Sequence, residues 1–160
     1  MSQEIFNYIQ KIGRNRYQVF YGLKATGECK LAQIVEYKPS FEEIKEMVLG
    51  AVNAEVDRTI LTGFVWTDGE GNEYPVWLST ENQFNYKSAF DLAVQTGGAM
   101  LPVTFKFGTV DEPVYHEFTT LEELQDFYIR AIQFIQATYQ AGWAEKDSID
   151  WSDYEHVVEL

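Results

Sequence analysis

The chain has 160 residues, a net charge of −13 and a single cysteine, Cys29. This length suits one domain with a single core, and the negative charge disfavours nucleic acid and anionic membrane surfaces, since like charges repel. One cysteine excludes an intrachain disulfide and suits a reducing compartment. No apolar run approaches 18 residues and the first residues resemble no secretory signal, so we expect neither a membrane span nor a signal peptide.

The charge is distributed unevenly along the chain. Residues 11–38 hold six basic and two acidic side chains, a balance of +4, whereas residues 111–160 hold twelve acidic and two basic ones, a balance of −10. Two interpretations remain open. Either the charged side chains form a solvated surface, or regions of opposite sign meet within one chain or between two chains.

An alternating pattern near the start predicts a β-hairpin. Arg16–Leu23 alternates, with Tyr17, Val19, Tyr21 and Leu23 on one face, and Lys30–Tyr37 follows with a similar pattern. The link 24–28 has the composition of a turn. Ile5–Ile12 is a candidate further strand that ends at a turn over 13–15. Residues 1–38 are therefore predicted to be N-terminal strands of unassigned type.

Three helix starts recur at a spacing of 40 residues. Ser40…Glu43, Thr80…Gln83 and Thr120…Glu123 have the spacing of a capping box, in which side chain and backbone amide bond reciprocally. Apolar residues recur at helical spacing after each start. The predicted helices run over about Phe41–Leu61, Glu81–Gln95 and Leu121–Ala141.

The ends and faces of these helices are also predicted from the pattern. Gly142 is the expected C-cap of the third helix, and the acidic tail, residues 151–160, is expected to fray together with the few residues before it. The inward face of the second helix is expected to carry Tyr86, Ala89, Phe90, Ala93 and Val94.

Two further hairpins are predicted between the helices. Gly63–Trp66 and Pro75–Leu78 flank a turn-rich run that contains Asp-Gly and Gly-Asn pairs. Val103–Phe107 alternates strictly, and Val114–Phe118 returns after a turn. The expected fold is therefore α+β, with antiparallel strand hairpins alternating with three helices in strand-strand-helix units, as a single domain over residues 1–160.

Residues with catalytic or metal-binding chemistry are few. His116 lacks a second histidine four positions away, so it matches no zinc-protease motif and a structural role is expected. His156 lies among acidic residues, where a weak metal contact is the alternative. Cys29 has no histidine near it in the sequence, which favours an unreactive thiol. We therefore expect no catalytic residue, no bound metal and no cofactor.

The aromatic content of 4 Trp, 10 Tyr and 11 Phe allows two interpretations. Most of these residues fall at the spacing of buried faces and predict an aromatic core; the alternative is a surface that binds protein or sugar. The run 82–87 adds amide side chains to aromatic rings at a helix start. The candidate binding residues are Trp66, Trp77, Asn82, Asn85 and Tyr86.

Three stretches carry a family resemblance. They are Asp57–Trp66 with the hairpin that leads to Trp77-Leu78-Ser79, the strand Leu101–Lys106, and Phe118–Leu124 with the helix that leads to Gly142–Ile149. Together they resemble a domain of unknown function found in bacteriophages and prophages, often beside tail or tail-fibre genes, in a version similar to those of gut Bacteroidales. The resemblance covers about residues 40–150. The matching single positions are Arg58, Gly63, Phe64, Trp66, Trp143 and Lys146.

The resemblance implies a non-enzymatic structural or interaction protein derived from a phage or prophage and associated with a tail or tail fibre. Such a protein would be cytoplasmic or a component of the virion, and its partner would be another protein, such as a phage structural protein. The wide apolar stripe of the third predicted helix adds the expectation of a homo-oligomer. A sugar- or peptide-binding module is the alternative, and a hydrolase is a third hypothesis.

Overall fold

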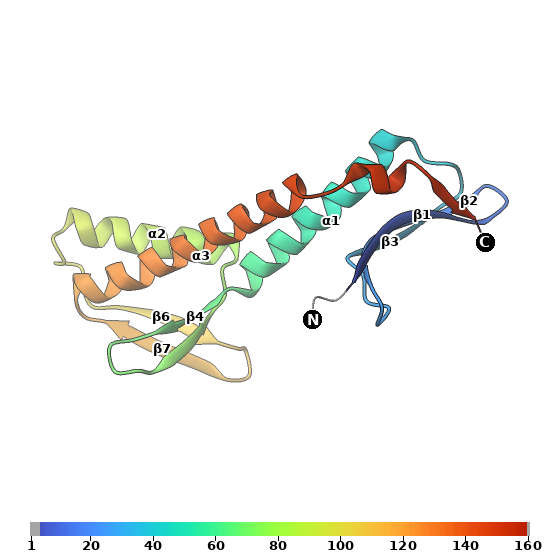
Figure 1. Ribbon diagram of the computed structural model, residues 1–160. Helices are drawn as coiled ribbons and strands as arrows, with labels where there is room; N and C mark the ends of the chain where they lie inside the picture. The colour runs from blue at the N-terminus through green and yellow to red at the C-terminus, as the bar shows by residue number, and fades with distance from the viewer. Residues whose placement is uncertain (1–3, 160) are drawn as a thin grey trace. The chain divides into compact units, whose positions relative to one another are not determined.

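The computed structural model describes residues 4–159, and its fold class is α+β, as expected. The described residues form three α-helices, one 3₁₀ helix and eight strands (Figure 1). Their contacts divide the chain into two compact units. Unit 1 comprises the described residues up to Glu55 and from Gly142 onward, and unit 2 comprises Val56–Ala141. Helices α1 (Phe41–Thr62) and α3 (Leu121–Asp147) therefore contribute residues to both units.

Unit 1 is built on a four-stranded sheet with the strand order β3-β2-β1-β8. β1 (Ile5–Gly13), β2 (Arg16–Lys24) and β3 (Leu31–Val35) pair antiparallel, which confirms the N-terminal hairpin and places the first candidate strand in the same sheet. Asn15 lies in the short turn between β1 and β2 with a φ of 56°, a left-handed conformation that asparagine tolerates.

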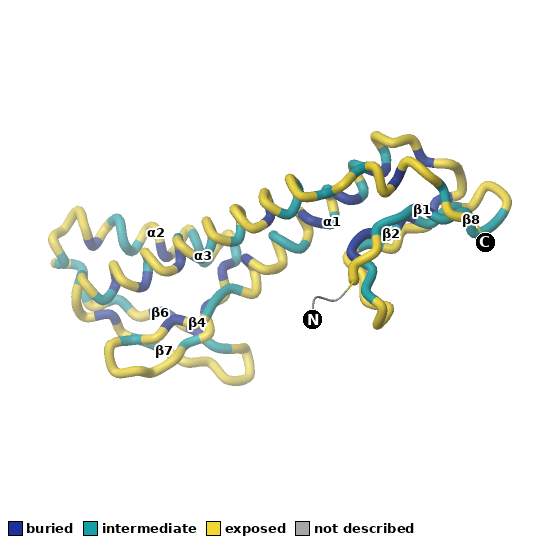
Figure 2. The backbone as a smooth tube through the Cα atoms, in the orientation of Figure 1, coloured by how far each residue is buried: buried dark blue, intermediate teal, exposed yellow. Residues whose placement is uncertain are grey.

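The core of unit 1 lies between one face of this sheet and the first part of α1. Buried residues recur every four positions along α1, so they form one stripe toward the strands (Figure 2). Hydrophobic side chains from both elements make up this core: Ile9, Val19, Tyr21, Ile44, Val48 and Val52.

The C-terminal segment forms regular structure up to Glu159, so the expectation of a frayed tail is wrong for these residues, and Leu160 lies outside the described residues. α3 continues to Asp147, and Gly142 lies inside the helix instead of capping it. The 3₁₀ helix η1 (Trp151–Tyr154) and strand β8 (Val157–Glu159) follow, and β8 pairs parallel with the middle of β1. Tyr154 is buried, and its hydroxyl donates to the Phe20 carbonyl at 2.7 Å. An aromatic anchor and a strand pairing therefore hold this acidic segment.

Unit 2 contains helix α2 (Thr80–Gln95) and two separate two-stranded sheets, together with the adjoining parts of α1 and α3. Both sheets are antiparallel hairpins, as predicted. The first consists of β4 (Phe64–Thr67) and β5 (Glu73–Val76), and the second of β6 (Val103–Gly108) and β7 (Pro113–Phe118).

Gly63, one of the positions that carry the family resemblance, is required by a close backbone approach. It joins α1 to β4 with a φ of 81°, which favours glycine. A Cβ atom at this position would lie 1.6 Å from the Val76 carbonyl oxygen on β5. Any other residue would therefore displace the first hairpin.

The core of unit 2 is aromatic, which agrees with the prediction from the spacing of the Phe and Tyr residues. Phe127 of α3 is fully buried at its centre, and both hairpins and α2 contribute rings around it. The ring centroids lie 5.0–6.4 Å from that of Phe127, a range typical of edge-to-face and tilted aromatic pairs. The surrounding rings are those of Phe64, Trp66, Tyr86, Phe105, Phe107 and Phe118.

Two of the three predicted helix caps are confirmed. The Ser40 hydroxyl accepts from the Glu43 amide at 3.2 Å, and the Glu43 carboxylate accepts from the Ser40 amide at 3.3 Å, which completes a capping box. The Thr120 hydroxyl accepts from the Glu123 amide at 3.2 Å.

The cap predicted for α2 is wrong by one residue. Ser79, not Thr80, is the N-cap, because its hydroxyl accepts from the Asn82 amide at 3.1 Å. The Gln83 side chain donates to the Leu78 carbonyl at 2.8 Å instead of closing a capping box. Val94, predicted to face inward, is 52% exposed, because it lies one residue around the helix from the buried Ala93.

The corrected cap makes a direct prediction. Ser79→Ala should lower the free energy of unfolding by about 1 kcal/mol, because one orphan amide of α2 loses its acceptor. Thr80→Ala is the matched control and should change stability by less than about 0.5 kcal/mol. Urea unfolding followed by tryptophan fluorescence measures both; equal effects of the two substitutions would contradict the assignment of Ser79.

Candidate functional site

The five residues proposed from the sequence as a binding surface do not lie on one surface. Trp66 and Tyr86 are buried in the aromatic core of unit 2, with 1% and 6% of their surface exposed, so that part of the prediction is wrong. Trp77 is 43% exposed and Asn85 is exposed. The Asn82 side chain donates to the Trp77 carbonyl at 3.0 Å, which ties it to the start of α2. Trp66 and Tyr86 therefore belong to the aromatic core and not to a binding surface.

An apolar groove of about 280 Å³ lies between α2 and α3 in unit 2. We call it the α2–α3 groove. Its first wall is formed by the start of α2 and the residue before its cap, and its second wall by the middle of α3. The lining residues are Leu78, Thr80, Gln83, Phe84, Tyr86 and Lys87 on the first wall and Tyr128, Ala131, Ile132 and Ile135 on the second.

Helix packing in unit 2 sets the width of this groove. Farther along α2, Phe90 stacks on Tyr128 of α3 with ring centroids 4.7 Å apart, which holds the two helices together at that level. Tyr86 reaches inward between the helices to the aromatic core, where its ring lies 5.0 Å from that of Phe127. The groove is therefore positioned by the core, since both walls are anchored in it.

The chemistry of the groove is that of a hydrophobic binding surface. Burial raises the pKa of the Tyr86 phenol to about 12, so its hydroxyl is neutral near pH 7. The Gln83 amide already donates to a backbone carbonyl, and the Lys87 ammonium pairs with Asp91 one turn along α2. Phe84 is 69% exposed on the groove wall. An exposed aromatic ring beside an apolar depression is typical of a site that takes apolar side chains.

A chain of hydrogen bonds links four titratable residues across unit 2. The Asp68 carboxylate accepts from the Tyr74 hydroxyl at 3.1 Å, the Tyr74 oxygen lies 3.2 Å from His116 Nδ1, and His116 Nε2 lies 2.6 Å from Glu123 Oε1. The hydrogen of the Tyr74 hydroxyl lies in its bond to Asp68, so the Tyr74 oxygen can accept from His116 Nδ1. Both ring nitrogens of His116 therefore have hydrogen-bond partners within unit 2.

The surroundings of these residues indicate a structural role. The His116 side chain is 14% exposed, and its ring lies 4.6–5.1 Å from the rings of Phe118, Tyr74 and Trp66. Burial and the hydrogen bond to Asp68 raise the pKa of Tyr74. Hydrogen bonds from the backbone and side chain of Asn72, among others, outweigh burial and lower the pKa of Asp68. The four residues thus join the two hairpins to the start of α3.

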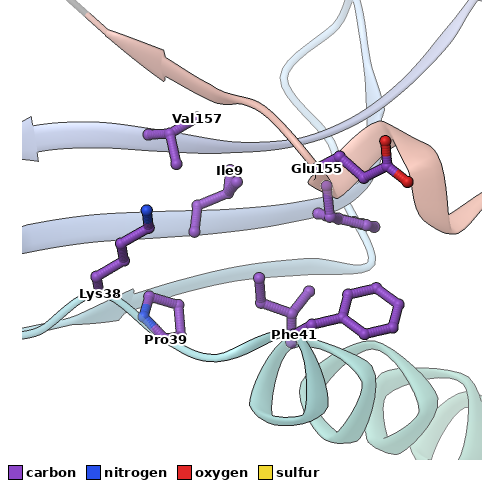
Figure 3. Close-up of a pocket in the computed structure, with 8 residues that line it drawn as sticks. Ile9, Lys38, Pro39, Phe41, Glu155 and Val157 are labelled. Atoms are coloured by element: carbon purple, nitrogen blue, oxygen red, sulfur yellow. The ribbon is translucent and has the colours of Figure 1, made fainter.

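Unit 1 has a pocket of about 330 Å³ where the C-terminal segment crosses between β1 and α1 (Figure 3). Ile9 and Val157 line it from neighbouring strands, and Phe41 lines it from the first turn of α1. Lys38 and Glu155 lie on either side of these apolar side chains. The pocket holds no convergent set of polar groups, so it fits the closure of a core better than a reaction site.

A second depression in unit 1, of about 300 Å³, contains an ion-pair cluster. The Lys30 ammonium pairs with Glu145 of α3 and lies 3.1 Å from Glu55 Oε2 of α1. Burial alone would lower the pKa of Lys30, but its hydrogen bonds to the two carboxylates outweigh that effect and raise it. The cluster connects the β2–β3 loop to both helices, which is a structural function.

The remaining chemical candidates lie apart from these pockets. Cys29 is an exposed free thiol and His156 is exposed on the C-terminal segment. Within residues 4–159, no three His, Cys, Asp or Glu side chains gather into a group that could hold a metal ion. None of the helices in this range has the length and apolar character needed to cross a membrane.

Comparison with known families identifies the chain. The profile of the domain of unknown function DUF4376 matches residues 43–159, so the chain belongs to the DUF4376 family. The matched range contains all of α2, both hairpins of unit 2, almost all of α1 and all of α3 and β8, whereas β1–β3 precede it. Comparisons with curated proteins and with solved structures returned no match.

Substitution of His116 tests its structural role, with substitution of His156 as the control. His116→Ala should lower the free energy of unfolding by about 2 kcal/mol, because it opens a cavity among three rings and removes a partner from Glu123. His156→Ala is the matched control and should leave stability within about 0.5 kcal/mol of the wild type. Urea unfolding at constant pH measures both, and an unchanged midpoint for His116→Ala would contradict the structural role.

Proposed function

We propose that this protein is a non-enzymatic interaction module of phage or prophage origin that takes part in tail or tail-fibre assembly, and that the α2–α3 groove is its binding site. The observation that supports a binding role is the exposed Phe84 beside a groove lined by Leu78, Ile132 and Ile135. The groove lies entirely within the range matched by the DUF4376 family, so it belongs to the part shared with relatives. The phage assignment rests on the sequence resemblance described above.

The size of the groove favours a peptide segment as the ligand. At about 280 Å³ it lies at the small end of ligand pockets, which suits a few side chains better than a whole cofactor. Burying one Leu or Phe side chain contributes roughly 1.5–3 kcal/mol. Two or three such anchors on one face of a partner helix or strand would contribute roughly 3–9 kcal/mol before the costs of association, so we expect a weak complex.

The groove also bears on the alternatives. The sugar-binding hypothesis needs amide groups that can turn to a ligand, but the NH₂ groups of Asn82 and Gln83 already donate to backbone carbonyls. The hydrolase hypothesis needs a free base beside a cleft, and His116 is held between Tyr74 and Glu123. The same alternative also included peptide binding. An apolar groove suits a peptide, so peptide binding becomes part of the main proposal.

Substitution of Phe84 tests the binding site. In cells that produce the phage or carry the prophage, tagged wild-type protein should co-purify with a structural protein of the particle. Phe84→Glu should reduce that recovery at least tenfold, because it places a charge against the apolar groove and removes the exposed ring. Quantitative mass spectrometry of the purified complexes measures the recovery.

The matched control for this experiment lies on the same helix. Val94 is also exposed on α2 but does not line the groove, so Val94→Glu should leave the recovery of the partner unchanged. Equal loss for the two variants would show a general effect of charge on α2 and contradict the groove as the site. Recovery of partners with no phage structural protein among them would contradict the tail-assembly role.

A further inference from the structure

The sheet of unit 1 is apolar on both faces, although its own helices cover only one. Strand register places Tyr8 beside Phe20 and Phe6 beside Leu23 on the face opposite to Ile9 and Val19. Across the same outer face, Gln18 pairs with Ile34 of β3, and Gln10 pairs with Val158 of β8. We call this surface the outer sheet face.

Several large apolar side chains on the outer sheet face are exposed to solvent. Phe6 is 44% exposed, Ile34 and Val158 are each 46% exposed, and the rings of Tyr8 and Phe20 pack on each other with centroids 4.8 Å apart. Within unit 1, α1 and η1 both lie on the other side of the sheet (Figure 1), where Ile9 and Val19 are buried. An antiparallel sheet with one solvated face normally alternates apolar and polar residues, and here Tyr8, Phe20 and Ile34 interrupt that alternation on the outer face.

The charge on the outer sheet face is confined to its end. Arg16, the first residue of β2, pairs with Glu36 at 3.2 Å, and both side chains are exposed. The centre of the face carries only apolar side chains and the neighbouring amides of Gln10 and Gln18. An uncharged centre with a charged rim is the pattern of a protein–protein interface. Such a centre offers no charged group that could bind nucleic acid or a charged peptide.

The properties of the face match a second copy of the chain. Amide side chains both donate and accept, so the pair Gln10–Gln18 is complementary to itself across a two-fold axis. The four strands span roughly 400 Å² at about 3.3 Å per residue and about 4.8 Å between strands. Two such faces bury roughly 800 Å² as a flat area and more with their side chains, which lies in the range of weak, transient contacts below about 1,200 Å².

We propose that two copies of this protein associate through their outer sheet faces and form a weak, two-fold symmetric sandwich of sheets. The stripe of α3 from which a homo-oligomer was predicted does not carry this proposal. Phe127 of α3 is fully buried within unit 2, and Phe134 stacks on Phe64 with ring centroids 5.6 Å apart. The dimer contact is instead placed on strands β1–β3, outside the family-matched range, with a contribution from β8.

Salt dependence separates this dimer from one formed by opposite charges. Each copy carries a net charge of −13, so two copies repel each other at low ionic strength. Screening that repulsion should strengthen an apolar contact as salt rises from 0.05 to 0.5 M. A dimer that joins the basic segment 11–38 of one copy to the acidic residues 111–160 of another should weaken over the same range.

Sedimentation equilibrium between about 5 and 500 µM tests the proposal. The wild-type chain, 18.5 kDa as a monomer, should show a concentration-dependent approach to twice that mass, with a dissociation constant that falls as salt rises. Ile34→Lys should raise that constant at least tenfold, because each copy would bury an unpaired ammonium group within the apolar contact. Val65→Lys, at a position 57% exposed on β4 of unit 2, is the matched control and should dimerise like the wild type.

Three results would overturn the proposal: a monomer at every concentration, a dimer that Ile34→Lys leaves intact, or a dimer that salt weakens. Circular dichroism and thermal unfolding establish that each variant is folded. If Ile34→Lys does not fold, Phe6→Ser and Ile34→Thr take its place, since both keep the inner face of the sheet unchanged. Each must raise the dissociation constant at least threefold, and unchanged values would contradict the outer sheet face as the contact.

Discussion

The packing of aromatic rings around Phe127 is the interaction on which unit 2 depends. The ring lies between both hairpins, α2 and α3, so the elements that carry Trp66, Tyr86 and Phe118 meet at one side chain. Phe127 is fully buried, and truncation of a buried Phe to Ala typically lowers the free energy of unfolding by about 3–5 kcal/mol. Because Tyr86 joins the core from α2, the same packing sets the separation of the two helices and so gives the groove its shape.

Much of the fold follows from local patterns in the sequence. Hairpins, helix starts and the α+β class were predicted because alternation, turn residues and caps are local signals. The C-terminal segment was mispredicted because its order depends on residues far away: Tyr154 bonds to Phe20, and β8 pairs with β1. Ser79 and Thr80 are both good caps, and only the observed bond to Asn82 separates them.

The candidate site was only partly predictable. The run 82–87 drew attention to the start of α2, which forms one wall of the groove, but periodicity could not show that Ile132 and Ile135 of α3 form the other. Trp66 and Tyr86 were assigned to a surface because aromatic side chains are common in binding sites. In the structure both side chains are buried in the aromatic core of unit 2. Likewise, alternation in Arg16–Leu23 predicted a strand, but only the position of α1 shows which face of the sheet is covered.

Site-specific photo-crosslinking tests the central claim, that the α2–α3 groove binds a structural protein, most directly. A photoreactive phenylalanine analogue would replace Phe84 in one preparation and Val94 in another, within cells that assemble the particle. The account predicts that the probe at position 84 forms a covalent adduct with one phage structural protein and that the probe at position 94 does not. Adducts of equal yield from both positions, or no adduct from position 84, would contradict it.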